Sequence, residues 1–255
     1  IRSKGAHDLV SRADHESEAR VIAEIQRRFP DHLILAEESG WRGDRDGAEA
    51  EFEWIIDPLD GTANFLQGLP IFCLSIACRY RGELVAAAIL DPVGDNLFTA
   101  VRGGGARWNG RPMRVSDHPG LEGAFLATGY PFRARRALDL YLEVFREVFL
   151  TARAIRRCGA AALDLAYTAA GVFDGFFEFR LSPWDIAAGA LLVREAGGVV
   201  TDLDGGEGFV ASGNVVAAPQ RVHPRLLTTV RRHADEAKLE EVDPQRNNPV
   251  AAPVG

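Results

Sequence analysis

Several signatures of familiar protein classes are absent from this sequence of 255 residues. Its three cysteines form no Cys-x-x-Cys pair and are odd in number, which argues against a zinc site and a disulfide framework. No histidines form a His-Glu-x-x-His motif and no serine stands in Gly-x-Ser-x-Gly, so zinc hydrolysis and serine catalysis lack support. No run of about eighteen apolar residues occurs. We therefore expect a cytoplasmic protein whose cysteines, Cys73, Cys78 and Cys158, lie in the core.

Positive charge is also scarce. The sequence has 29 Lys and Arg against 36 Asp and Glu, a formal net charge of -7. This balance argues against general binding of nucleic acid or of anionic membranes, which needs clustered basic residues. The 47% apolar and 25% charged composition is typical of a globular protein with a sizeable core. If such an acidic protein binds an anion, it must reverse its charge locally, and bound metal ions would do so.

The stretch from Glu53 to Thr62 carries the strongest chemical signal. An apolar strand leads directly into Asp57 and Asp60, which are separated by Pro58 and Leu59. Two ionised acids this close need a shared proton or a cation, and hard oxygen ligands favour magnesium, calcium or manganese. A bare strand-to-helix turn, with Asp60 as an N-cap and Asp57 solvated, is the alternative. Covalent aspartyl-phosphate chemistry would use Asp-x-Asp, whereas Asp-x-x-Asp favours metal ligation.

The first half of the chain has the periodicity of one helix followed by strands. We predict the helix over residues 14–29 and an antiparallel meander of strands at 33–36, 52–56, 72–80, 84–90 and 96–101. Residues 62–66 are a second helix start. The glycine-rich segment 103–110 lacks the spacing of a phosphate-binding loop, so we predict a hairpin turn there.

The second half alternates between helix and strand, which predicts a parallel α/β unit. The expected helices span 137–152, 160–170, 185–196 and 224–233, and the expected strands span 154–158, 175–181, 199–201 and 215–218. The tail 235–255 has few apolar residues and three prolines, so we predict disorder there. The expected organisation is one α/β domain of residues 1–234, with halves of about 1–136 and 137–234.

Three separated motifs resemble those of the inositol monophosphatase family. They are Trp54–Phe65, Trp184–Gly198 and the upstream acidic motif Ala36–Ser39, and Lys4–Val10 is similar to the family's opening motif. The resemblance extends from Lys4 to about His233 and implies a layered αβαβα sandwich that forms a homodimer. It also implies that an N-terminal helix found in relatives is missing before Ile1.

The resemblance implies a metal site and an activated water. Its ligands would be Glu37, Asp57, the Leu59 carbonyl, Asp60 and Asp185, holding two Mg²⁺ ions, with a third, weaker ion near Glu37 also allowed. Thr62, Asp14 and Glu37 would orient the attacking water. Taken one at a time, these residues have simpler interpretations: Asp14 and Asp185 as helix N-caps, Thr62 as a helix-start hydroxyl and Glu37 as a solvated acid.

The same resemblance implies a substrate site for a small phosphomonoester. The phosphate would meet the N–H groups of Gly61 and Thr62, and Asp60, Asp185, Glu178 and the turn Gly159-Ala160-Ala161 would complete the site. Glu178 could equally be an exposed strand residue. Relatives often have a basic residue or His at Gln67 and a hydroxyl at Ala160, so a substrate hydrogen bond is in doubt.

These features predict a lithium-sensitive, Mg²⁺-dependent phosphatase similar to inositol-1-monophosphatase. Histidinol phosphate and fructose 1,6-bisphosphate are alternative substrates on the same scaffold. A partner-binding module with a regulatory role is the alternative from a different class of function.

Overall fold

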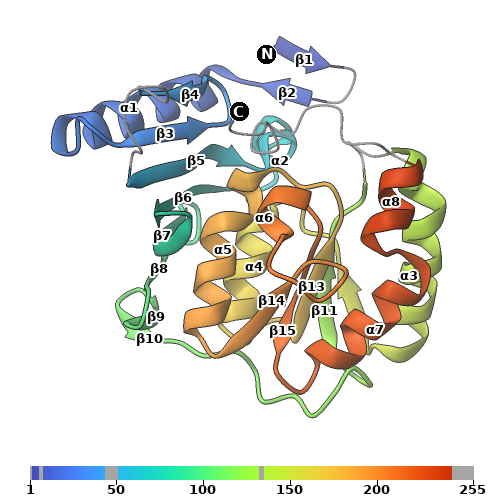
Figure 1. Cartoon of the computed structure of the whole chain (residues 1–255). Helices are drawn as coiled ribbons and strands as arrows, with labels where there is room; N and C mark the ends of the chain where they lie inside the picture. Colours follow the sequence, from blue (N-terminus) through green and yellow to red (C-terminus); the bar gives the residue numbers. More distant parts are fainter. Residues whose placement is uncertain (1, 6–7, 44–50, 132–134, 243–255) are drawn as a thin grey trace.

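The computed structural model describes residues 2–5, 8–43, 51–131 and 135–242, which form two stacked sheets with helices between and outside them (Figure 1). The helices are α1 (Arg12–Arg28), α2 (Thr62–Gln67), η1 (Arg135–Ala137), α3 (Leu138–Thr151), α4 (Ala161–Ala169), α5 (Pro183–Glu195), α6 (Phe209–Ser212), α7 (His223–His233) and α8 (Glu236–Val242). No helix in these ranges is long and apolar enough to cross a membrane. The layered α/β arrangement is confirmed.

The first sheet has eight strands in the order β10-β9-β8-β7-β6-β5-β3-β4. Its strands are β3 (Leu33–Ala36), β4 (Gly40–Arg42), β5 (Phe52–Asp60), β6 (Cys73–Tyr80), β7 (Glu83–Asp91), β8 (Asn96–Val101), β9 (Gly105–Trp108) and β10 (Arg111–Pro112). A separate hairpin joins β1 (Arg2–Gly5) to β2 (Asp8–Val10). The strands from β5 to β8 are antiparallel neighbours, as predicted. The glycine-rich segment 103–110 is a hairpin turn only where it joins β8 to β9, because residues 105–108 form β9 itself, a strand that we did not predict.

The prediction of a fully antiparallel meander is wrong at β3, which pairs with β5 in parallel. Antiparallel neighbours need only a tight turn, but the chain leaves β3 through β4 and the long connection that follows, so β5 can re-enter in the same direction. The consequence matters for the site. Because the carboxyl ends of β3 and β5 meet at one edge of the sheet, Glu37 and Asp57 lie close together.

The second sheet has five strands in the order β12-β11-β13-β15-β14. They are β11 (Phe125–Thr128), β12 (Ala154–Arg156), β13 (Gly175–Glu178), β14 (Gly198–Thr201) and β15 (Val215–Pro219). The predicted parallel arrangement is confirmed for β12 and β13, which both run parallel to β11. It is wrong for β15, which runs antiparallel to both of its neighbours, β13 and β14. The predicted boundary near residue 136 is also wrong, since β11 already belongs to this sheet.

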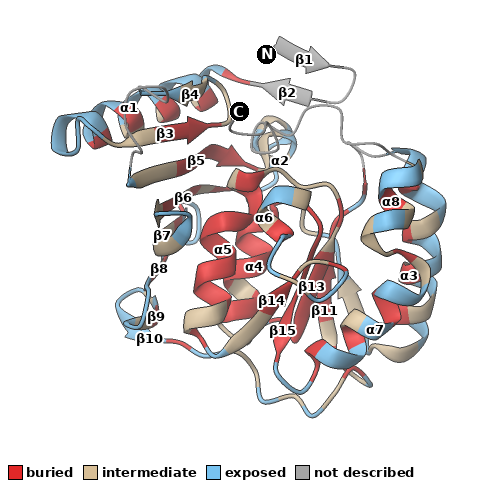
Figure 2. Cartoon of the chain, in the orientation of Figure 1, coloured by how far each residue is buried: buried red, intermediate tan, exposed pale blue. Residues whose placement is uncertain are grey.

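A middle layer of two helices, α4 and α5, explains why these helices are apolar on nearly every side. Helices α4 and α5 pack against each other between the two sheets, so α5 is buried on nearly every side, from Pro183 to Val193 (Figure 2). A helix that is apolar all round is expected where both of its faces meet a sheet. Helix α1 packs against the first sheet and keeps an exposed polar face, with Ile22 and Ile25 buried.

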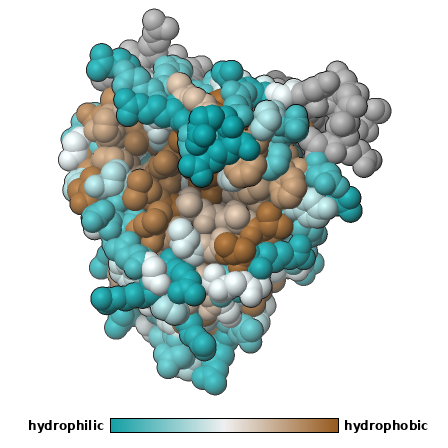
Figure 3. Space-filling model, turned by 90° about the vertical axis from the view of Figure 1, so that its left-hand side faces the viewer, coloured by the Kyte–Doolittle hydropathy of each residue, from teal (hydrophilic) through white to brown (hydrophobic). Residues whose placement is uncertain are grey.

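The outer face of the first sheet is covered unevenly. Helix α1 packs over β3 and β5, while the outward residues of β7 and β8, Leu90, Leu97 and Val101, stay exposed. Their neighbours Ile89, Phe98 and Ala100 point inward and are buried, as the alternation of a strand requires. Figure 3 views the molecule from this side and shows apolar groups gathered in the middle of the face.

The prediction of disorder after residue 235 is wrong for α8. Its Leu239 is fully buried in the core around the second sheet, and Val242 packs against the same cluster. A few well-placed apolar residues were enough to dock a short helix that composition alone did not indicate. Residues 243–255 lie outside the described residues. Of the cysteines, Cys73 and Cys78 are buried as predicted and Cys158 is partly buried.

Candidate active site

A cavity of about 190 Å³ opens between the two sheets, at the carboxyl ends of β5 and β13 and the start of α5. All but one of the residues that the sequence proposed for the site line it: Glu37, Asp57, Leu59, Asp60, Gly61, Thr62, Gly159, Ala160, Ala161, Glu178 and Asp185. The exception is Asp14, which is fully buried and reaches the cavity through Thr62. Segments far apart in the chain therefore meet here.

Three buried aspartates form the centre of the site. Asp57, Asp60 and Asp185 each offer an oxygen within 4.8 Å of the others. Burial raises the pKa of Asp57 well above its usual value, and the charges of Glu37, Asp60 and Asp185 raise it further. Such a cluster keeps its charges only if cations neutralise them. The donor set consists of carboxylate oxygens, which fits Mg²⁺.

Strand β5 places its two aspartates through a local irregularity. The pairing with β6 shifts between Asp57 and Asp60, where Pro58 has no N–H to offer the ladder. Asp57 Oδ1 accepts the Leu59 N–H at 2.9 Å. Asp60 Oδ2 accepts the Ala162 N–H at 2.7 Å, so the Asp60 side chain satisfies a backbone N–H in the first turn of α4. It does not cap α2, whose N-cap residue is Gly61. The two acids therefore join the first sheet to the middle layer.

Gly61 is required where the chain turns into α2. It is the N-cap residue, with a φ of 95°, and a Cβ there would lie 2.9 Å from the Ile71 carbonyl oxygen and 3.3 Å from Ala160 Cβ. Any larger residue would be strained and would press on the opposite wall. The absence of a side chain leaves the backbone of this turn open to the cavity.

Thr62 and Asp14 form the predicted pair, although Asp14 is not an N-cap. Ser11 caps α1, and Asp14 is the third residue of that helix, with Oδ2 accepting from the Ser11 N–H at 2.8 Å and the Ser11 hydroxyl at 2.5 Å. Its Oδ1 accepts the Thr62 hydroxyl at 2.9 Å, and that hydroxyl also lies 3.0 Å from the Leu59 carbonyl oxygen. The helix start thus fixes a carboxylate behind Thr62.

The start of α5 uses the same arrangement. Ser182 is the N-cap, and Asp185, again the third residue, accepts the Ser182 N–H at 2.7 Å. The expected N-cap role for Asp185 is therefore corrected, as for Asp14. Glu37 comes directly after β3, where its N–H bonds the Ile56 carbonyl at 3.1 Å, and its side chain hydrogen-bonds Asp57.

The other wall of the cavity contains Glu178, which is not the exposed strand residue that its position also allowed. Burial raises the pKa of its carboxyl well above normal, with the charges of Asp164 and Asp185 adding to the effect. The carboxyl lies so close over Gly129 that a Cβ there would be 1.9 Å from Glu178 Oε1. Glu178 can therefore face the cavity only because residue 129 has no side chain.

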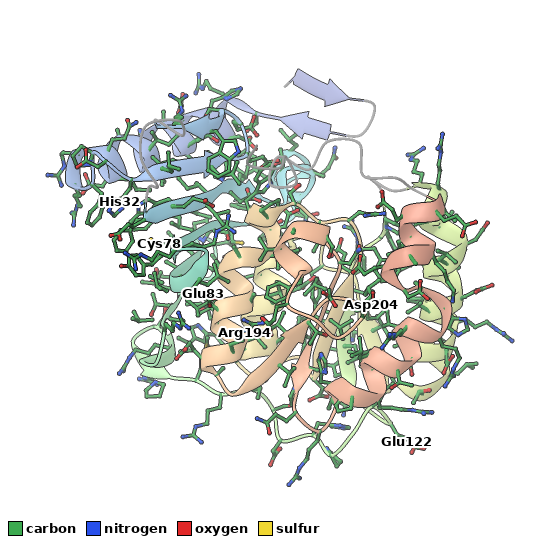
Figure 4. The ribbon with its side chains drawn as sticks, in the orientation of Figure 1. His32, Cys78, Glu83, Glu122, Arg194 and Asp204 are labelled. Atoms are coloured by element: carbon green, nitrogen blue, oxygen red, sulfur yellow. The ribbon has the colours of Figure 1, made fainter. Side chains whose placement is uncertain are left out.

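Among the cavity residues that the sequence analysis missed, three have polar or charged side chains. Tyr130 lies two residues after the end of β11, and Arg180 lies two residues after Glu178. Arg157 precedes the Gly159 turn, with its guanidinium 5.2 Å from the Tyr130 ring centroid. The end of an apolar strand at Thr128-Gly129-Tyr130 was the available signal. By contrast, Arg194 lies at the far end of α5 (Figure 4), where it stacks on Phe209 and pairs with Glu207.

Comparisons with known proteins find one family over most of the chain. Residues 1–235 match the model of the inositol monophosphatase family. A protein of Pseudomonas aeruginosa named Nus factor SuhB is 48% identical over 235 residues, which cover 91% of this chain and 86% of that protein.

Solved structures give the same result. The extragenic suppressor protein suhB of Bartonella henselae matches with a TM-score of 0.86 at 42% identity, covering 91% of this chain and 88% of its own. The inositol monophosphatase of Anabaena matches with a TM-score of 0.82 at 40% identity, covering 89% and 88%.

Proposed function

The chain belongs to the inositol monophosphatase family, and on this premise we propose that it is a Mg²⁺-dependent phosphatase of small phosphomonoesters. One observation supports this most strongly: Asp57, Asp60 and Asp185 come from two distant segments and meet within 4.8 Å in a cavity. Such a cluster is unfavourable without a cation, and a cation there would attract a phosphate. Inositol 1-phosphate is the proposed substrate.

The metal ligands we propose are Glu37, Asp57, the Leu59 carbonyl, Asp60 and Asp185. They would hold two Mg²⁺ ions, and Glu37 could share a third. Bound Mg²⁺ would lower the pKa of a water molecule and neutralise the charge that develops on the phosphate. The chain itself supplies the cavity, the ligand positions and the orientation of the water.

Thr62 and Asp14 are proposed to orient the attacking water. The Thr62 hydroxyl has one proton and two acceptors in reach, Asp14 Oδ1 at 2.9 Å and the Leu59 carbonyl at 3.0 Å. If a metal ion takes the Leu59 carbonyl, the proton goes to Asp14. The Thr62 oxygen can then accept a hydrogen bond from a water molecule, which points a lone pair of that water toward the phosphorus. Ser11 holds Asp14 in place for this task.

The remaining wall would hold the alcohol that leaves the phosphate. Carboxylate oxygens of Glu178 and Asp185 can accept hydrogen bonds from the hydroxyl groups of a polyol, and the Gly159-Ala160-Ala161 turn also lines the cavity. A volume of about 190 Å³ suits a small polyol better than a nucleotide. Histidinol phosphate and fructose 1,6-bisphosphate remain candidate substrates in this proposal, and Ala160, which has no hydroxyl, gives inositol no side-chain hydrogen bond.

Replacement of Asp57 tests the activity. Phosphate release from inositol 1-phosphate, histidinol phosphate and fructose 1,6-bisphosphate is measured with Mg²⁺, and Asp57→Asn is expected to abolish it. Asp91→Asn is the matched control, because Asp91 is also a buried aspartate at a strand end. Among the described residues, its hydrogen bonds all go to its own turn, at Val93, Gly94 and Asn96. Full turnover by Asp57→Asn would refute the assignment.

Two further properties are part of this proposal. We expect lithium ions to inhibit phosphate release. We also propose that the protein forms a homodimer, which light scattering tests.

A second candidate function is recruitment of transcription machinery. Relatives that are 46–48% identical carry the name Nus factor. A role of this kind could coexist with hydrolysis, and the Asp57→Asn variant separates the two: capture of RNA polymerase components by this variant at wild-type level would show binding without turnover. If neither form captures them while both fold, this second proposal fails.

A further inference from the structure

The loop Phe179–Ser182 joins the two walls of the cavity. It begins after Glu178, the last residue of β13, and ends at Ser182, whose N–H binds Asp185. Within it, Arg180 has a φ of 59°, in the left-handed region that non-glycine residues rarely occupy. Such a conformation persists only where surrounding contacts impose it. The contacts around Arg180 therefore set the geometry between Glu178 and Asp185.

The backbone of the loop is held from the segment before β15. The Arg180 N–H donates to Asn214 Oδ1 at 3.0 Å, and the Leu181 N–H donates to the Gly213 carbonyl at 2.8 Å. Asn214 is fully buried. With Ser182 bonded to Asp185, three consecutive N–H groups of the loop have a named partner.

Helix α8 in turn holds both Asn214 and Arg180. Glu236 Oε2 accepts from Asn214 Nδ2 at 2.6 Å, and its Oε1 accepts the Leu203 N–H at 3.3 Å. One turn later, Glu240 Oε2 lies 3.2 Å from Arg180 Nη2, and only 7% of the Arg180 side chain is exposed. The spacing of four residues places both glutamates on one face of the helix. The buried Leu239 anchors α8 in the core.

From these contacts we propose that α8 positions the substrate wall of the active site. Glu240 acts through Arg180, and Glu236 acts through Asn214, to keep Glu178 and Asp185 at the spacing that a polyol phosphate needs. This inference rests on the proposed function. The consequence is that displacement of α8 weakens substrate binding, although α8 itself does not line the cavity. Truncation of the chain, or a partner that binds the apolar side of α8, would displace the helix.

The position of the glutamates separates this role from simple support of the fold. Neither Glu236 nor Glu240 lines the cavity, so neither can contact substrate. A merely structural role predicts a lower Tm with unchanged kinetics. A positioning role predicts a change in KM with little change in kcat at saturating Mg²⁺, because the metal ligands of β5 and the Thr62–Asp14 pair remain in place and a displaced Asp185 keeps its charge.

The experiment uses the full chain with three matched substitutions in one helix: Glu236→Gln, Glu240→Gln and Glu241→Gln. Glu241 is exposed and serves as the control that loses the same charge. We expect KM for inositol 1-phosphate to rise about threefold in Glu240→Gln, where a partly exposed ion pair is lost. We expect it to rise about tenfold in Glu236→Gln, where a part-buried hydrogen bond to the fully buried Asn214 weakens. We expect kcat within about twofold of wild type throughout, and Arg180→Lys, which keeps the ion pair, to be milder than Arg180→Gln.

Amide hydrogen exchange of residues 180–182 gives a readout that does not need turnover. Exchange should accelerate in Glu236→Gln and Glu240→Gln and stay at the wild-type rate in Glu241→Gln. Unchanged exchange together with unchanged KM in both variants would overturn the positioning role, whatever happens to Tm. If the wild-type protein shows no turnover on any phosphomonoester, the proposed function fails, and the exchange rates still decide whether α8 positions the loop.

Discussion

Helices α1 and α5 begin with the same local structure and contribute different chemistry. In each, a serine N-cap is followed by an aspartate at the third helical position, and the Oδ2 of that aspartate binds the serine N–H, at 2.8 Å for Asp14 and 2.7 Å for Asp185. This capping box fixes the carboxylate and aims its other oxygen away from the helix. Asp14 meets the hydroxyl of Thr62, whereas Asp185 meets the acids Asp57 and Asp60. In the function we propose, the surroundings of the box, and not the box itself, decide whether the aspartate orients water or binds a cation.

Among the substitutions that test this comparison, the largest effect is expected from Asp185→Asn. Asparagine can still accept the Ser182 N–H through its side-chain oxygen, so the capping box survives while the negative charge is lost. We expect kcat/KM to fall by about a thousandfold or more and Mg²⁺ affinity, measured by calorimetry, to fall with it. The metal-free variant should unfold at a higher temperature than wild type, because Asp185 is one of the charges that raise the pKa of Asp57. Wild-type Mg²⁺ binding would contradict the assignment of Asp185 as a ligand.

Thr62→Val is expected to have the next largest effect and a different signature. Valine keeps the shape of threonine but removes the hydroxyl that binds Asp14. We expect kcat to fall about a hundredfold, with Mg²⁺ affinity unchanged, because the Thr62 hydroxyl is not part of the acid cluster. Thr62→Ser should retain most of the activity. If Thr62→Val weakened Mg²⁺ binding as strongly as Asp185→Asn, the two helix starts would not have separate roles.

The sequence motifs located the site but not the contacts that build it. Asp57, Asp60 and Asp185 could be proposed because their motifs are local, and the helix and strand types follow from periodicity. The parallel pairing of β3 with β5 could not be predicted, since it depends on a long connection whose path no local pattern fixes. The capping role of Ser11 was missed because Asp14 is itself a good N-cap residue. Helix α8 depends on the burial of Leu239, which only the tertiary structure provides.

Helix α4 sharpens the comparison, because it has an acid in its first turn but no capping serine. Its N-cap is Ala160, and Asp164 is 1% exposed, with Oδ1 lacking a hydrogen-bond partner among the described residues. Burial raises the pKa of Asp164 to about 8 from its usual 3.8. The folded protein therefore holds a proton between these values that the unfolded chain releases, so its stability falls as pH rises toward 8.

Between pH 6 and pH 8, release of the Asp164 proton should lower the free energy of unfolding by about 2 kcal/mol. Urea unfolding of wild type and Asp164→Asn at both pH values measures it. The wild type should lose stability over the interval, and the variant, which has no proton to release there, should lose about 2 kcal/mol less. Equal losses in the two proteins would show that Asp164 is already ionised at pH 6. An acid at a helix start that lacks the serine would then be no different from Asp14.

The smallest effects are expected from removing each capping serine, and they test the comparison directly. Ser11→Ala and Ser182→Ala should each destabilise the fold by about 1 kcal/mol, the usual cost of losing an N-cap side chain. Thermal unfolding should not distinguish them. The kinetics should, because each serine steadies a carboxylate with a different task. Ser11→Ala removes the hydroxyl 2.5 Å from Asp14 Oδ2 and should lower kcat about threefold at unchanged Mg²⁺ affinity.

Ser182→Ala should instead weaken Mg²⁺ binding by a similar factor, with kcat restored at saturating metal, because Asp185 keeps its charge but loses part of the box that orients it. The crossed pattern is the informative outcome: two identical deletions with equal stability costs and opposite kinetic signatures. If both variants lost only kcat, or both lost only metal affinity, the two capping boxes would affect activity through the stability of the whole fold. The proposal that Asp14 and Asp185 have different roles would then be wrong.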